Sequence, residues 1–159
     1  MEIFRTDRPE ILKWIVPHIV EAPDYDVTTI INRIASGMIA DPESICVIVA
    51  IDGSEIIGYS ITWIVRNHAW IGQAWTDPNY NREEVGKNIL ELTKEWVLEK
   101  DIHDIRFETS RSAKALTKAW GFEEFSSIMR IFGIGIINQS IDSAKFIIDI
   151  INKVFNRCY

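Results

Sequence analysis

Three consecutive β-strand patterns, joined by tight turns, constrain the fold of this sequence more than any other feature. Residues 44–51 (SICVIVAI) form a β-branched run that ends at Asp52 and Gly53, a dipeptide typical of two-residue hairpin loops. Residues 56–66 (IIGYSITWIVR) form the partner run, and residues 69–76 (AWIGQAWT) form a third. Connections this short favour antiparallel pairing, so we predict a three-stranded meander.

A long amphipathic helix and further strands follow the meander. Residues 82–100 carry apolar side chains at helical spacing. In residues 102–109, apolar and polar side chains alternate in part, as in a strand. A short helix at residues 111–120, ended by Gly121, and one strand over residues 122–132 come next. A strand–helix–strand unit pairs its two strands in parallel. The expected fold class is therefore α/β, with a mixed, mostly antiparallel central sheet flanked by helices.

The two ends of the chain add elements to this core. Residues 1–5 predict a strand, and residues 27–38 predict a helix. Pro17 should interrupt the helical pattern of residues 11–20, because proline removes a backbone donor and clashes with the preceding turn. Residues 140–157 predict an amphipathic C-terminal helix with a broad apolar stripe. That helix either docks on its own sheet or forms an interface with a second copy or another protein.

Composition narrows the kinds of partner. A formal net charge of −6 argues against a nucleic-acid partner and suits a cationic acceptor. No repeat or linker interrupts the chain, so residues 1–159 are expected to form a single domain. A signal peptide and a run of about 18 apolar residues are both missing, so no membrane partner is expected. Cys46 and Cys158 lack metal-site spacing, which predicts free thiols in a reducing cytoplasm and no metal.

Four short motifs occur in order between residues 52 and 122. They are IGY at residues 57–59, TDPNYN at residues 76–81, GKNIL at residues 86–90 and WGF at residues 120–122. Each motif alone is weak. Together, in this order and at these intervals, they resemble the GNAT superfamily of acyl-CoA N-acyltransferases, over about half of the chain.

This resemblance implies acetyl-CoA as co-substrate and an amine as acetyl acceptor. In GNAT proteins the pantetheine lies between the fourth and fifth strands of the sheet. The pyrophosphate is held by backbone N–H groups at the start of the central helix, where the helix dipole favours an anion. The residues implied to bind the cofactor are Ala74, Trp75, Thr76, Asn81, Arg82, Val85, Gly86, Lys87 and Ser110.

The sequence departs from the GNAT pattern near the chemistry. Glu84 stands where the phosphate-binding loop usually has its first glycine. Thr117 stands where many relatives have a tyrosine that protonates the departing thiolate. Residues 70–73 (WIGQ) also lack the acidic base that relatives often carry on this strand. His68 is the candidate base, because histidine exchanges protons near neutral pH. The catalytic candidates are therefore His68 and Thr117.

Two functions remain open from the sequence. The first is an N-acetyltransferase that acts on an amine-bearing small molecule or protein, mainly by positioning the reactants. The second is a catalytically inactive GNAT-fold subunit of a larger assembly, which uses its C-terminal helix or its tryptophans as a contact surface.

Overall fold

The computed structural model describes residues 1–19, 26–108, 114–125 and 128–132 of the 159-residue chain. In this part of the chain seven strands form one sheet in the order β1-β2-β3-β4-β5-β7-β6. Only β4 and β5 are parallel neighbours there, and every other pair is antiparallel. The predicted mixed, mostly antiparallel sheet is thus confirmed. The strands are β1 (Glu2–Thr6), β2 (Ile45–Asp52), β3 (Glu55–Val65), β4 (His68–Thr76), β5 (Asp104–Glu108), β6 (Glu123–Phe125) and β7 (Ile128–Phe132).

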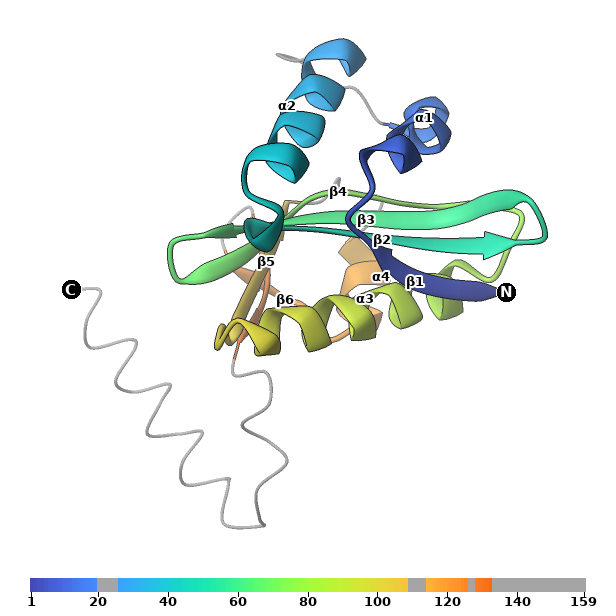
Figure 1. Cartoon of the computed structure of the whole chain (residues 1–159). Helices are drawn as coiled ribbons and strands as arrows, with labels where there is room; N and C mark the ends of the chain where they lie inside the picture. Colours follow the sequence, from blue (N-terminus) through green and yellow to red (C-terminus); the bar gives the residue numbers. More distant parts are fainter. Residues whose placement is uncertain (20–25, 109–113, 126–127, 133–159) are drawn as a thin grey trace, which may run out of the picture.

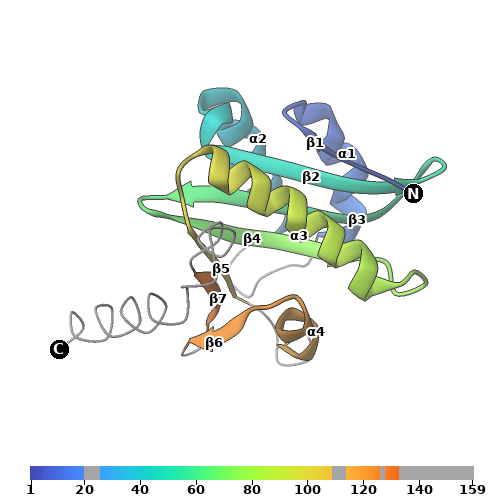
Figure 2. The same ribbon diagram turned by 90° about the horizontal axis from the view of Figure 1, so that it is seen from below.

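Helices cover both faces of the sheet. The short α1 (Leu12–Ile15) and α2 (Val27–Ala40) lie on one face, and α3 (Arg82–Glu99) crosses the other (Figure 1). A last helix, α4 (Lys114–Ala119), lies beside β6 (Figure 2). Pro17 interrupts the first helical segment as predicted, since α1 is followed by a 3₁₀ turn at Val16–His18.

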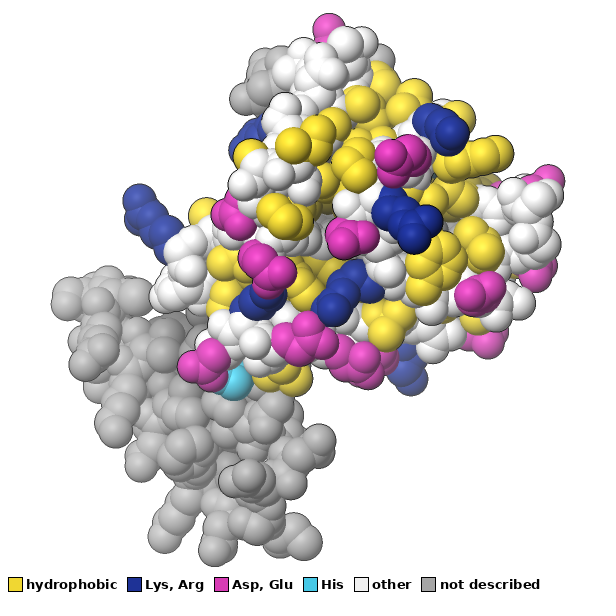
Figure 3. Space-filling view, viewed as in Figure 1, with side chains coloured by type: hydrophobic (Ala, Val, Ile, Leu, Met, Phe, Trp, Pro, Cys, Tyr) yellow, Lys and Arg dark blue, Asp and Glu magenta, His cyan; other side chains and the backbone are white. Residues whose placement is uncertain are grey.

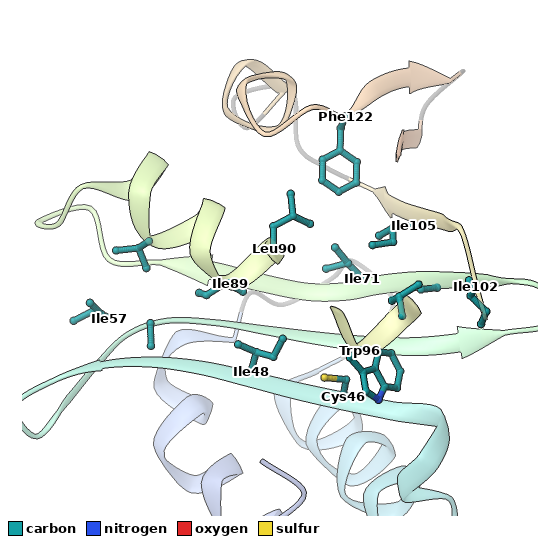
Figure 4. Close-up of a cluster of buried hydrophobic side chains, with 14 residues drawn as sticks. Cys46, Ile48, Ile57, Ile71, Ile89, Leu90, Trp96, Ile102, Ile105 and Phe122 are labelled. Carbon is teal, nitrogen blue, oxygen red and sulfur yellow. The ribbon is translucent and has the colours of Figure 1, made fainter. Parts of the chain in front are cut away.

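The central strands are buried on both sides. On β2, Cys46, Ile48 and Ala50 belong to the core cluster beneath α3, whereas Val47 and Val49 belong to the cluster beneath α1 and α2. This explains why residues 44–51 read as an almost continuous apolar run. Figure 4 shows side chains of the first cluster converging from α3 and from the sheet.

One predicted element is wrong. The run at residues 122–132 is not a single strand, because β6 and β7 pair with each other antiparallel, with Phe125 opposite Ile128. Strand β7 also pairs with β5, which places this hairpin at the edge of the sheet. The predicted helix at residues 140–157 lies outside the described residues. Within the described residues, no helix is long and apolar enough to cross a membrane.

Candidate functional site

A β-bulge in β4 sets the direction of the side chains at the site. Ile61 of β3 lies opposite Gln73, but Thr62 lies opposite Ile71, so Gly72 is an extra residue in β4. A Cβ atom at Gly72 would lie 2.1 Å from the Trp63 ring, which explains the glycine. An extra residue reverses the alternation of side chains along the strand.

As a result, the end of β4 presents different residues to each face of the sheet. Ile71, before the bulge, and Ala74, after it, both pack in the cluster beneath α3. Trp75 packs in the other cluster, beneath α1 and α2. Without the bulge, the side chains at positions 74 and 75 would exchange faces.

Strands β4 and β5 separate after a short parallel ladder. Strand β5 pairs with Ala69, Trp70 and Ile71, and no ladder joins the two strands from Gly72 to Thr76 within the described residues. Figure 2 shows β5 running away from β4 at a steep angle. The sheet is therefore open along the last five residues of β4.

A cavity of about 80 Å³ lies at this opening. Its walls come from both core clusters, since Tyr59 and Trp75 belong to one side of the sheet and Leu90 and Phe122 to the other. Figure 4 shows Phe122 facing Leu90 across this part of the molecule. The lining residues are Tyr59, Ser60, Ile71, Ala74, Trp75, Thr76, Arg82, Gly86, Ile89, Leu90, Thr93, Phe107, Thr117, Trp120 and Phe122.

The N-terminal turn of α3 borders the cavity. The Asn81 side chain caps the helix, with Oδ1 accepting from the Glu84 N–H at 3.3 Å and Nδ2 donating to Glu84 Oε2 at 3.3 Å. The Glu84 side chain is thus held by the cap and is exposed. Helix geometry leaves the N–H groups of Arg82 and Glu83 without intrahelical partners. Arg82 Nε donates to Thr76 Oγ1 at 3.2 Å, which ties the helix start to the end of β4.

The cavity wall carries little charge. Among the described lining residues, only Arg82 and Tyr59 are ionisable. Burial raises the pKa of the Tyr59 phenol well above its usual value, and the hydroxyl donates to the His18 carbonyl at 3.2 Å. Ser60 and Thr93 place two buried hydroxyls 3.3 Å apart in the wall. Thr93 donates to the Ile89 carbonyl, so Ser60 is the donor between the two hydroxyls.

The model of the Acetyltransferase (GNAT) family matches residues 7–122, which is more than half of the chain. The chain belongs to the GNAT acetyltransferase family. This confirms the resemblance found in the sequence motifs. A comparison with curated protein sequences found no significant match.

Solved GNAT structures share the fold at low sequence identity. The PaiA N-acetyltransferase from Thermoplasma acidophilum, in complex with coenzyme A, is 18% identical with a TM-score of 0.59, covering 83% of this chain and 99% of that chain. The ribosomal-protein-S18-alanine N-acetyltransferase from Escherichia coli is 15% identical with a TM-score of 0.62, covering 88% and 99%. A predicted acetyltransferase with acetyl-CoA from Clostridium acetobutylicum is 14% identical with a TM-score of 0.65, covering 79% and 91%.

Six of the residues predicted from the GNAT motifs line one cavity. They are Ala74, Trp75, Thr76, Arg82, Gly86 and Thr117. Asn81 lies next to the cavity as the cap of α3. The Val85 side chain is buried in the core against Gly58 and is not among the described lining residues. Lys87 is exposed on α3 and Ser110 lies outside the described residues.

His68 is not among the described residues that line the cavity. It is the first residue of β4, opposite Val65, and its ring contacts Trp70 edge-to-face at 6.4 Å. The nearest cavity-lining residue of β4 is Ile71, three positions along the strand, which is roughly 10 Å. Of the two catalytic candidates, only Thr117 lies in the cavity wall. Within the described residues, no group of three or more His, Cys, Asp or Glu side chains could hold a metal ion.

Sequence reasoning missed two features of this GNAT site. The His18 ring stacks on Trp75, with the centroids 4.0 Å apart, and Tyr59 lies on the same side of the sheet. No sequence spacing connects residues this far apart, so no local signal identifies them. Trp120 also lines the cavity, and it does belong to a recognised motif, since it directly precedes Gly121 and Phe122.

Proposed function

We propose that this chain is an N-acetyltransferase that transfers an acetyl group from acetyl-CoA to an amine on a small molecule or protein. The observation that carries the proposal is the opening between β4 and β5, which holds a cavity beside the start of α3. A thin, mostly apolar slot next to free backbone donors suits a ligand with a flexible chain and a diphosphate.

The residues at the opening fit acetyl-CoA in three respects. The backbone of Gly72 to Thr76 has no β5 ladder, so its free polar groups can pair with the amides of pantetheine. The Arg82 and Glu83 N–H groups, together with the Arg82 guanidinium, can hold the pyrophosphate. The small Ala74 side chain leaves room for the ligand in the cavity wall. When bound, acetyl-CoA supplies a thioester whose carbonyl carbon an amine can attack.

The acceptor would approach from the side of α1. Tyr59 and Trp75 line the cavity on that side, and His18 stacks on Trp75. Aromatic faces attract cations, and the chain has a net charge of −6, so an amine that is protonated in solution suits this side. The chain's contribution would be mainly to position the amine and exclude water.

The alternative is a GNAT-fold subunit that binds CoA or a partner without transferring the acetyl group. One observation favours it. No carboxylate or histidine is among the described lining residues, and the buried Thr117 replaces the usual tyrosine. None of the described lining side chains is therefore a strong base for the proton of the amine.

Calorimetric titration with acetyl-CoA tests the proposal. We expect a dissociation constant in the micromolar range, which corresponds to about −8 kcal/mol. The variant Arg82→Ala should weaken binding about tenfold or more, because a charge-assisted contact to phosphate is lost. Arg33→Ala is the matched control, since Arg33 is an exposed cation on α2, on the other face of the sheet, and should leave the affinity unchanged.

Catalysis is measured separately by the release of free CoA thiol with a panel of amines. Acetyl-CoA-dependent acetylation of one of these amines would support the enzyme. Binding without turnover would support an inactive subunit that binds CoA. An absence of binding at millimolar acetyl-CoA would refute the enzyme and favour a subunit that binds only a partner.

A further inference from the structure

Trp120 packs directly on the backbone of α3. A Cβ atom at Gly86 would lie 2.0 Å from Trp120 Cζ2 and 2.8 Å from Cε2. Any residue larger than glycine at position 86 would clash with the indole in its present position. Because Cε2 is bonded to Nε1, the N–H edge of the ring also lies close to this part of α3.

The indole N–H of Trp120 is buried and unpaired. Trp120 Nε1 has no hydrogen-bond partner within the part of the chain that the structure describes. Buried polar groups without a partner are uncommon, and each one calls for an explanation such as a ligand or an ordered water. Trp120 is also one of the walls of the cavity, together with Thr76 and Arg82.

Two hydroxyl oxygens in the cavity wall already take part in other hydrogen bonds. Thr76 Oγ1 accepts from Arg82 Nε, and Thr93 Oγ1 takes part in hydrogen bonds to Ser60 and to the Ile89 carbonyl. An indole nitrogen can only donate, so its partner must supply an acceptor atom. A ligand in the cavity that Trp120 lines could supply such an atom.

We propose that the Trp120 indole N–H donates a hydrogen bond to an oxygen of bound CoA, either a pantetheine carbonyl or a pyrophosphate oxygen. The inference rests on the proposed function, since it assigns a binding residue to the same cavity. Gly86 would then serve CoA indirectly, by making room for the ring that carries the donor. The bond would form only on binding, which leaves the donor unpaired in the free protein.

The test uses Trp120→Phe, which keeps an aromatic ring against Gly86 and removes the donor. We expect the dissociation constant for CoA, measured by calorimetry, to rise about three- to tenfold. Titrations with pantetheine and with ADP, which carry the two kinds of oxygen separately, then locate the acceptor by which of them loses affinity. Trp14→Phe is the matched control, because Trp14 is 58% exposed on α1 and should not affect binding.

A second measurement needs no stable variant. In ¹⁵N-correlated spectra of the wild-type protein, CoA should shift the Trp120 indole proton downfield and slow its exchange with water. If CoA binds the wild type but leaves this resonance unchanged, or if Trp120→Phe binds CoA with wild-type affinity, the inference is wrong and the proposed function stands. If the wild type does not bind CoA at all, the proposed function fails, and the inference fails with it.

Discussion

Glutamate and glycine have unexpected roles at the start of α3. Glu84 replaces a glycine of the GNAT phosphate loop, and its side chain and N–H both bond to the Asn81 cap. Such a reciprocal cap stabilises the first turn of a helix. Gly86 keeps its place in the motif, but its missing side chain makes room for Trp120. The motif pattern identified both positions, while these contacts depend on three-dimensional packing that no local pattern encodes.

The charge of Glu84 should oppose a bound diphosphate. We expect Glu84→Gln to lower the dissociation constant for CoA about two- to fivefold at low salt, because one negative charge near the phosphates is removed. Glutamine keeps the oxygen that accepts from Asn81. The difference should shrink at high ionic strength, since exposed charges are screened. Glu95→Gln, an exposed change farther along α3, is the control and should have no effect. Equal affinities at low salt would place the phosphates away from Glu84.

Elements with strong local signals were predicted almost to their ends. The Asp52–Gly53 turn is such a case, because Gly53 has a φ of 60°, which glycine adopts without strain. The long helix, predicted at residues 82–100, is found at Arg82–Glu99. The run at residues 122–132 was misread because its only turn-forming residues are Ser126 and Ser127, and serine favours turns more weakly than Gly, Pro, Asn or Asp. Its division depends on β7 pairing with β5, which is a contact between distant residues.

The open edge of β4 should be visible in hydrogen exchange. Amides of residues 72–76 that do not bond to β3 lack a β5 partner, so we expect them to exchange at least about tenfold faster than the β5-facing amides of Ala69–Ile71. CoA should slow them, because its pantetheine would pair with this edge. The outward amides of β1, an edge strand, are the control, and should exchange fast with or without CoA. Slow exchange at residues 72–76 in the free protein would mean that the opening is closed.

The site depends on the arrangement of the whole molecule. The bulge in β4, the divergence of β5 and the start of α3 meet at one point, between two core clusters. Sequence motifs located Ala74, Thr76 and Arg82 at this point, but the contact of His18 with Trp75 joins segments that are far apart in the chain. On the face in Figure 3, acidic and basic side chains are interspersed and neither gathers into a broad patch, so the surface charge of this face does not mark the site.

Cys46 offers a test of how far the site and the core open together. The thiol is 2% exposed, lies near Trp96 in the cluster beneath α3 (Figure 4), and burial raises its pKa to about 12. Because the thiolate is the reactive form, iodoacetamide should modify Cys46 only after α3 separates from the sheet. That separation also destroys the start of α3 and the wall of the cavity. A saturating ligand should therefore slow the reaction.

The expected size follows from linkage. At a free acetyl-CoA concentration of 100 times its dissociation constant, labelling of Cys46 should slow about 100-fold, if only a state without the site is reactive. Mass spectrometry of a Cys158→Ser variant follows Cys46 alone, and labelling in urea, with and without acetyl-CoA, is the control and should be equally fast. A labelling rate that acetyl-CoA does not change, in a protein that binds it by calorimetry, would show that β2 opens locally while the cavity stays intact. The packing around Cys46 would then be energetically independent of the cavity, although both lie in the cluster beneath α3.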